Sequence, residues 1–194
     1  NDTCGIAHLR NDALEGARLI SVHCEQSSLP RAHFCDISFV HRNDYDLIDT
    51  LLDLNGTIFK EYEYRQGSTT VFTTPFEVYA NRRGVCQDFA HVEIAALRAH
   101  GLAAGYVSGY IRTIHSKDEI ALRGADASHA WVSVWCGEQA GWVHLDPTND
   151  LVAQEDHVAV AWGRVFSDVS PLRGVILGGD SHSYGVAVTL VPTG

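Results

Sequence analysis

Cys86 stands where a thiol can act as a nucleophile. It follows Gly84 and Val85 and opens an apolar segment with helical spacing that stops at Gly101. In the first turn of a helix, unpaired backbone N–H groups and the helix dipole favour a negatively charged sulfur. A thiol so placed is more acidic than an ordinary one when a cation lies nearby. Because a free cysteine is commonly just a small buried hydrophobe, the position predicts a nucleophile only if a base accompanies it.

His129 and Asp146 are expected to supply that base and the carboxylate that orients it. His129 begins one strand-like segment, and Asp146 ends the next one along the chain. We expect a hairpin with a two-residue turn at Gly137 and Glu138, which would place His129 directly opposite Asp146, although a longer loop with a bulge could preserve that pairing. A carboxylate beside an imidazole has the role of the third residue in a catalytic triad, with Cys86 as the nucleophile.

Three further residues could contact a substrate. Gln87 follows the nucleophile and could support an oxyanion hole whose first donor is the backbone N–H of Cys86, although polar residues in a first helical turn often face solvent. Trp131 shares a strand face with His129 and could line the site, whereas aromatic residues on strands are usually core. Asp126 lies in a loop and could reach a substrate, but a loop carboxylate in so acidic a chain is also expected to face water.

The 11 histidines and five cysteines raise the question of a metal site or a disulfide framework. The sequence contains neither an HExxH motif nor zinc-finger spacing, and it shows no EF-hand pattern. The cysteines are odd in number and irregularly spaced, without a CxxC pair, which favours a reducing compartment over disulfides. We therefore expect no metal and no cofactor, and a zinc hydrolase is the weaker alternative to thiol chemistry.

Composition limits the classes of partner. The 194 residues carry a formal net charge of −10 and contain no basic run, which disfavours binding to nucleic acid or to an anionic membrane surface. No apolar stretch approaches the roughly 20 residues of a membrane span, and the first residues show no signal-peptide pattern. We therefore expect a globular protein of the cytoplasm.

Helices come first along the chain and strand-like segments later, with short links between the strands. A capping box at Thr74 and Glu77, with Pro75 at the first helical position, predicts a short helix that ends near Asn81. The segment that begins at Cys86 is apolar nearly all round, which is typical of a central buried helix. This order predicts an α+β domain with a mostly antiparallel sheet. The other predicted elements are a helix from residue 43 or 44 to about 59 and strands at 103–113, 129–136, 141–146 and 184–191.

Four sequence blocks resemble bacterial transglutaminase-like proteins, which are cysteine-protease-like members of the transglutaminase core superfamily. The resemblance implies a papain-like, transglutaminase-core fold, in which a central helix carries the nucleophile and packs on the sheet. It also implies that Cys86 is the nucleophile, His129 the general base and acid, and Asp146 the orienting carboxylate. It runs from about Tyr62 to the C-terminus, and the blocks are Gly84 to His91, Tyr106 to Tyr110, Ala127 to Trp131 and Gly141 to Asn149.

The resemblance and the three residues together predict a thiol acyl-transfer enzyme. Such an enzyme would act on a peptide or protein substrate at amide bonds through a thioester, with hydrolysis slightly favoured over transamidation. A binding or structural module that uses the same scaffold without turnover is the alternative, but a scaffold has no need of a complete Cys–His–Asp set. Residues 1–40 do not resemble the family. We expect them to form an N-terminal segment of unassigned role before a catalytic core at 41–194, within a single domain.

Overall fold

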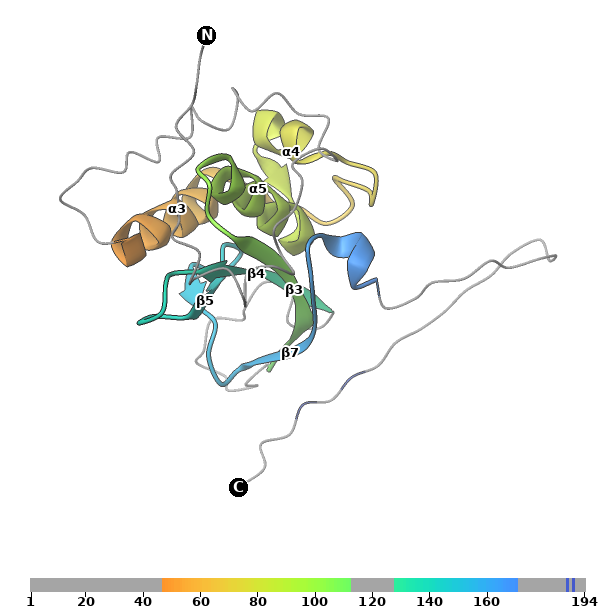
Figure 1. Ribbon diagram of the computed structural model, residues 1–194. Coiled ribbons are helices and arrows are strands. Elements are labelled where there is room, and N and C mark those ends of the chain that lie inside the picture. The colour runs from red at the N-terminus through yellow and green to blue at the C-terminus, as the bar shows by residue number, and fades with distance from the viewer. Residues whose placement is uncertain (1–46, 113–127, 171–187, 189, 191–194) are drawn as a thin grey trace, which may run out of the picture.

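The computed structural model describes residues 47–112, 128–170, 188 and 190 (Figure 1). In these ranges, the helices α3 (Leu47–Glu61), α4 (Pro75–Asn81) and α5 (Cys86–Ala99) precede the main sheet. That sheet has the strand order β6 (Leu151–Val152), β5 (Trp142–Asp146), β4 (His129–Trp135), β3 (Ala104–Ile111) and β7 (His157–Gly163), and each neighbouring pair is antiparallel. A short parallel pair, β1 (Glu63–Tyr64) with β2 (Arg83–Gly84), and the 3-10 helix η3 (Phe166–Asp168) complete the described elements. The predicted α+β class with a mostly antiparallel sheet is confirmed.

The helices form a layer beside the sheet (Figure 1). α5 packs directly on β4 and β3, and both α3 and α4 pack on α5. Its side chains are buried against these neighbours, and Phe89, Val92 and Leu97 are fully enclosed. Burial of each such side chain stabilises the fold by roughly 1.5–3 kcal/mol. The apolar segment that begins at Cys86 is therefore the central buried helix that its pattern predicts.

Asp88 fixes the first turn of α5. Its carboxylate accepts the backbone N–H of Val85 at 2.8 Å and the hydroxyl of Thr69 at 2.6 Å. A Cβ at residue 84 would lie 2.8 Å from Oδ2 of Asp88, so a side chain larger than that of Gly84 would displace this carboxylate. The lack of a side chain at Gly84 thus leaves room for the carboxylate that holds the first turn of α5.

The capping box predicted for α4 is present. The backbone N–H of Glu77 donates to Oγ1 of Thr74 at 3.3 Å, and the backbone N–H of Thr74 donates to Oε2 of Glu77 at 2.7 Å. The helix ends at Asn81, as its pattern predicts. In α3, Gly56 is buried, and a Cβ there would lie 3.3 Å from Oδ1 of Asp150, so this glycine lets the turn after β5 approach the helix.

The predicted two-residue turn between β4 and β5 is wrong. The link between the strands spans residues 136–141, and the backbone N–H of Gly141 closes its turn by donating to the carbonyl of Gly137 at 2.7 Å. Both glycines have positive φ, 91° at Gly137 and 67° at Gly141. The second glycine therefore belongs to the loop, because it adopts a conformation that favours glycine rather than that of a strand.

The longer loop moves the β4–β5 register by two residues from the predicted one. Ser133 pairs with His144, whereas the shorter turn would have paired Trp131 with His144. A shift of two residues leaves every side chain on its original face of the sheet, since side chains alternate with a period of two. His129 and Asp146 therefore stay on a common face, as diagonal neighbours instead of directly opposed ones.

The pairing of β7 with β3 contains a bulge at Val160 of β7, since Ser108 pairs with Ala161 and the next residue, Gly109, pairs with Ala159. A Cβ at Gly109 would lie 2.7 Å from Cη2 of Trp131 and would also collide with the backbone of β7. The missing side chain lets the indole and the strand pack closely, and His157 is the first residue of that strand.

Some predictions fall outside the described residues. This group contains the segment 1–40, residues 184–187, 189 and 191 of the last predicted strand, and Asp126. The division into residues 1–40 and 41–194 therefore stays a prediction. None of the helices in the described ranges is both long enough and apolar enough to cross a membrane.

Candidate active site

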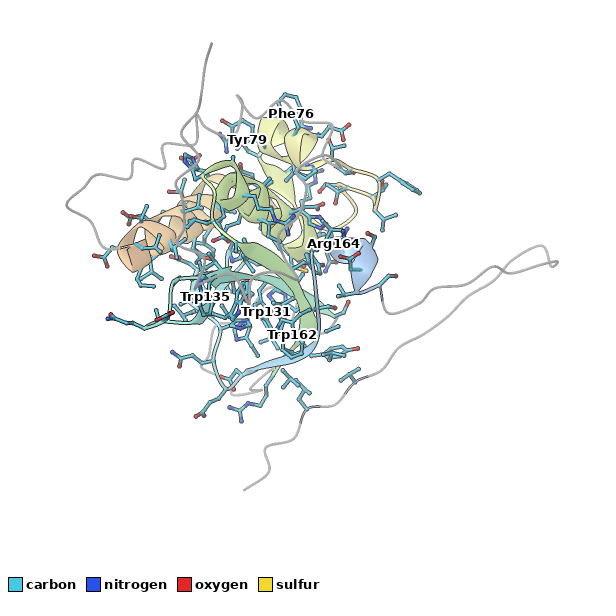
Figure 2. All side chains as sticks on the ribbon, viewed as in Figure 1. Phe76, Tyr79, Trp131, Trp135, Trp162 and Arg164 are labelled. Atoms are coloured by element: carbon cyan, nitrogen blue, oxygen red, sulfur yellow. The ribbon has the colours of Figure 1, made fainter. Side chains whose placement is uncertain are left out.

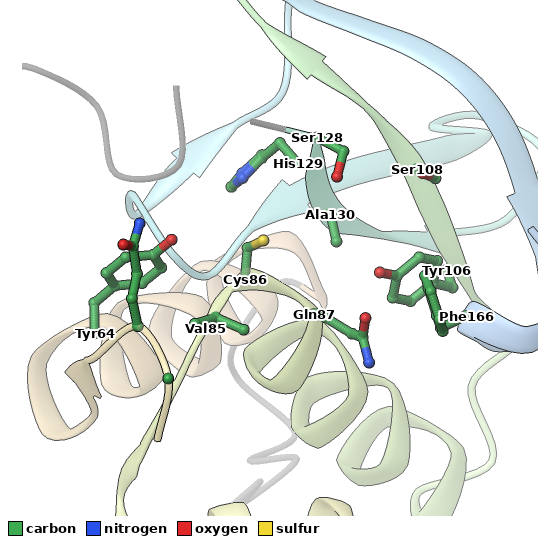
Figure 3. Close-up of a pocket in the computed structure, with 12 residues that line it drawn as sticks. Tyr64, Val85, Cys86, Gln87, Tyr106, Ser108, Ser128, His129, Ala130 and Phe166 are labelled. Carbon is green, nitrogen blue, oxygen red and sulfur yellow. The ribbon is translucent and has the colours of Figure 1, made fainter. Parts of the chain in front are cut away.

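The structure brings together the three residues predicted to do chemistry. Nε2 of His129 lies 2.9 Å from Oδ2 of Asp146, and both side chains are fully buried. Cys86 is half-buried at the beginning of α5, close enough to the imidazole to contribute to its pKa. Because Asp146 occupies Nε2, the ring nitrogen left for the sulfur is Nδ1, which is buried and has no hydrogen-bond partner within the described part of the chain. Figure 3 shows the sulfur of Cys86 beneath the ring of His129.

Four donors hold Asp146 as a carboxylate. Oδ2 accepts from Nδ2 of Asn149 at 2.8 Å, from His129 at 2.9 Å and from Nε2 of His157 at 3.2 Å, while Oδ1 accepts the backbone N–H of Thr148 at 3.0 Å. Burial alone would raise the pKa of Asp146, but the hydrogen bonds from the two imidazoles and from Asn149 hold that pKa well below its usual range. Asp146 is therefore negatively charged near neutral pH.

The same contacts make His129 a cation near neutral pH. Burial alone would lower the pKa of His129, but the hydrogen bond to Asp146 and the neighbouring sulfur of Cys86 raise it to about 9. This imidazolium lies beside the sulfur of Cys86 at the N-terminus of α5. The arrangement thus combines a nucleophilic sulfur with a proton donor that an ionised carboxylate holds in place.

Cys86 and His129 line a pocket of about 280 Å³ (Figure 3). Aromatic side chains from three separate elements form part of its wall, namely Tyr64, Tyr106 and Phe166. Gln87 also lines the pocket, where it can reach a bound molecule. The role of Gln87 in substrate binding stays a prediction.

Trp131 is placed differently from the prediction that it lines the site. Its side chain is 1% exposed and is absent from the pocket wall. Trp162 on β7, in contrast, is exposed at the surface (Figure 2). The indole stacks on the ring of His129, with centroids 6.0 Å apart, and its Nε1 donates to Nδ1 of His144 at 3.3 Å. Trp131 therefore supports the imidazole from behind. The strand pattern correctly placed Trp131 on the same face as His129. It could not predict on which side of the imidazole the pocket lies.

Sequence reasoning missed two side chains that contact Asp146. Asn149 follows Asp146 by three residues in a turn, and this spacing is an Asx-type signal that could have identified it. His157 carries no such signal. It reaches the carboxylate from β7, and only the pairing of β7 with β3 brings it there.

His91 holds one wall of the pocket in place. Its Nε2 accepts the backbone N–H of Phe166 at 3.2 Å, and its ring lies 5.0 Å from that of Tyr106. Burial, with a smaller contribution from the charge of Arg98, lowers the pKa of His91 to about 4. A neutral imidazole can accept this hydrogen bond, which ties η3 to α5 and places Phe166 in the pocket wall.

The ligand atoms of His129, Asp146 and His157 lie within 4.8 Å of one another, a spacing that a metal ion could use. Oδ2 of Asp146, however, already accepts three hydrogen bonds. A metal would also have to displace the proton that the raised pKa keeps on His129. These side chains fit a hydrogen-bonded carboxylate better than a metal centre.

Glu93 is a buried carboxyl group on α5, two turns beyond Cys86. It is 0% exposed, and neither carboxyl oxygen has a hydrogen-bond partner in the described ranges. Burial, together with the negative charges of Asp146 and Asp150, raises the pKa of Glu93 well above its ordinary value. Glu93 is therefore a neutral acid in the folded protein.

In wild type, Glu93 is expected to lower the free energy of unfolding as the pH rises. The Glu93→Gln variant should lack this decrease. The folded protein keeps the Glu93 proton, whereas the unfolded chain releases it above about pH 4.3. The unfolded state then binds fewer protons, so this group lowers the free energy of unfolding by up to about 1.4 kcal/mol per pH unit until the pH reaches the raised pKa. Urea denaturation between about pH 5 and pH 8 should show the variant gaining stability over wild type as pH rises. A pH-independent difference, or the same trend in the exposed loop variant Glu138→Gln, would contradict this.

A thiol at the beginning of a central helix, packed on an antiparallel sheet that carries histidine and aspartate, defines a transglutaminase-like architecture. Residues 39–147 match the profile of the Transglutaminase-like superfamily. An uncharacterised protein of Mycobacterium tuberculosis is 47% identical over 150 residues, which are 75% of this chain and 48% of that protein. The chain belongs to the transglutaminase-like superfamily, and the resemblance read from its four sequence blocks is confirmed.

A solved structure and a distant relative extend the comparison. The crystal structure of a Cytophaga hutchinsonii protein described as a "Putative Cysteine Protease" matches with a TM-score of 0.53 and 31% identity, over 64% of this chain and 39% of that one. The peptide-N(4)-(N-acetyl-beta-glucosaminyl)asparagine amidase of Gallus gallus is 24% identical over 98 residues, which are 50% of this chain and 13% of that enzyme. The chain spans about half the length of the mycobacterial relatives it matches.

Proposed function

We propose that this chain is a thiol acyl-transfer enzyme that hydrolyses amide bonds of peptides or proteins. The observation that carries the proposal is the buried hydrogen bond between Nε2 of His129 and Oδ2 of Asp146, which leaves Nδ1 of the imidazole for Cys86 at a pocket. The family and the similarity to a structure described as a cysteine protease support the same class of chemistry. The name of the Gallus gallus relative, an amidase, agrees with an amide as the bond that breaks.

The first half of the reaction forms a thioester. The thiolate of Cys86 attacks the carbonyl carbon of the scissile amide, and the negative charge moves to the carbonyl oxygen. The backbone N–H of Cys86, in the first turn of α5, is placed to donate to that oxygen. The tetrahedral intermediate then collapses: Nδ1 of His129 gives its proton to the leaving nitrogen, the C–N bond breaks and an amine departs.

The second half returns the enzyme to its starting state. Neutral His129 takes a proton from water, and the resulting hydroxide attacks the thioester carbonyl. The C–S bond breaks, the carboxylic acid leaves, and Cys86 is again a thiolate beside an imidazolium. An amine in place of water would give transamidation by the same steps. We favour hydrolysis because the thiol is half-buried at a pocket, so water can reach the thioester.

Selective alkylation tests the proposal. At pH 6.5 in the presence of a chelator, iodoacetamide should modify Cys86 about tenfold faster than Cys136, because a cysteine beside an imidazolium at a helix N-terminus is in the setting typical of a reactive thiol. Peptide libraries and glutamine–amine pairs then reveal which acyl acceptor is used. Equal alkylation rates would contradict the proposal. Turnover that the chelator abolishes would indicate a zinc hydrolase, and selective alkylation without turnover of any library would indicate a binding module.

A further inference from the structure

We propose that His157 is a positioning residue for this reaction, which holds the Asp146 carboxylate where His129 needs it. The inference rests on the proposed function. Nε2 of His157 lies 3.2 Å from Oδ2 of Asp146, the same oxygen that His129 contacts at 2.9 Å. The side chain of His157 is 4% exposed, so this contact is shielded from water. Two imidazoles from different strands therefore share one buried carboxylate oxygen.

His157 differs from the other groups that hold Asp146 because of where it comes from. Thr148 and Asn149 lie within three residues of Asp146 and move with it. His157 begins β7, which pairs with β3 on the far side of β4. Among the four donors, it is the one that ties the carboxylate to the β3–β7 side of the sheet.

The ring of His157 is itself held in place. It makes a T-shaped contact with the ring of Trp131, with centroids 5.2 Å apart and planes at 79°. The backbone N–H of His157 donates to the carbonyl of Gln154 at 3.0 Å, and residue 157 pairs with Ile111 in the sheet. Trp131 in turn stacks on His129. One indole therefore packs against both imidazoles, which fixes their rotamers relative to each other.

The direction of the hydrogen bond follows from the charge of Asp146. An ionised carboxylate only accepts, so Nε2 of His157 must carry the proton that it donates. A neutral imidazole is sufficient for this role. An amide placed at the same distance along the side chain should therefore replace it, whereas an aromatic ring without a donor should not.

Four variants at two positions test the inference, with iodoacetamide alkylation of Cys86 as the probe. His157→Phe keeps the T-shaped contact with Trp131 but lacks the donor, so the alkylation rate at pH 6.5 should fall about tenfold. His157→Gln, whose amide nitrogen reaches the position of Nε2, should stay within about threefold of wild type. His157→Asn is the shorter amide and should lose as much as His157→Phe. Val160→Thr, at an exposed position of the same strand, is the control for disturbance of β7 and should leave the rate unchanged.

A double-mutant comparison separates positioning from general support of the fold. In an Asp146→Ala background, His157→Phe should have little further effect, because His157 acts through the carboxylate that is no longer present. Persistence of the full tenfold loss would overturn the inference. Equal rates for His157→Gln and His157→Asn would also overturn it, and this pair of polar variants decides the question even if His157→Phe does not fold.

The outcomes distinguish this inference from the proposed function. If wild-type Cys86 is alkylated no faster than Cys136, the proposed function fails before any variant is made. If wild type shows the selective reaction and His157→Phe matches it, the inference about His157 fails while the proposed function stands.

Discussion

Cys86→Ala is expected to abolish covalent labelling and amide cleavage while leaving the fold intact. Without the sulfur no thioester can form, and loss of the nucleophile in a serine protease lowers turnover about a millionfold. The substitution removes one atom from a half-buried side chain, and the first turn of α5 is held by Asp88 rather than by the thiol. Loss of cleavage is measured as turnover of the peptide found by profiling. Loss of labelling is measured by intact mass after iodoacetamide treatment, and an intact fold by thermal melting.

Cys136→Ala is the matched control for the loss of a thiol. Cys136 follows β4, the strand that carries His129, but it does not line the pocket. Its sulfur lies 3.7 Å from the carbonyl of Val134. This variant should keep the activity of wild type. Activity that survives in Cys86→Ala with unchanged melting would rule out the proposed nucleophile, as would equal losses in the two variants.

Asp146→Asn is expected to leave a folded protein whose Cys86 alkylates about ten- to a thousandfold more slowly. The neutral amide no longer stabilises the imidazolium, so the pKa of His129 should fall below about 9 because burial then dominates. In a serine triad the corresponding change lowers turnover about ten-thousandfold. A thiol enzyme should lose less, since a cysteine–histidine ion pair can form without the third residue.

His144→Ala is the control for the third residue. His144 lies on the same strand face as Asp146, two residues earlier, but its Nδ1 accepts from Trp131 rather than contacting His129. Its removal should cost far less than the loss of the carboxylate. The pH dependence of alkylation in wild type and both variants, with an NMR titration of His129, measures the difference. If His144→Ala changes the profile and Asp146→Asn leaves it unaltered, the triad must be assigned differently.

Local signals in the sequence were sufficient for the elements that carry the chemistry. The capping box at Thr74 and Glu77 and the apolar segment after Gly84 each depend on residues within a few positions of one another, so the helices α4 and α5 could be located before any tertiary contact was known. The common face of His129 and Asp146 was equally predictable. Side chains alternate along a strand, and the error in the turn shifted the register by an even number of residues.

The sequence by itself thus determined the family, the α+β class and the candidate nucleophile, base and carboxylate. Tertiary structure alone decided the side of His129 on which Trp131 packs and the arrival of His157 at Asp146. It also decided that Glu93, a charged residue by type, is a buried neutral acid on the nucleophile's helix. These outcomes depend on the pairing of β7 with β3 and on the packing of α5 against β4 and β3. Contacts between residues so far apart in the chain cannot be predicted from local sequence patterns, because those patterns report only on neighbouring residues.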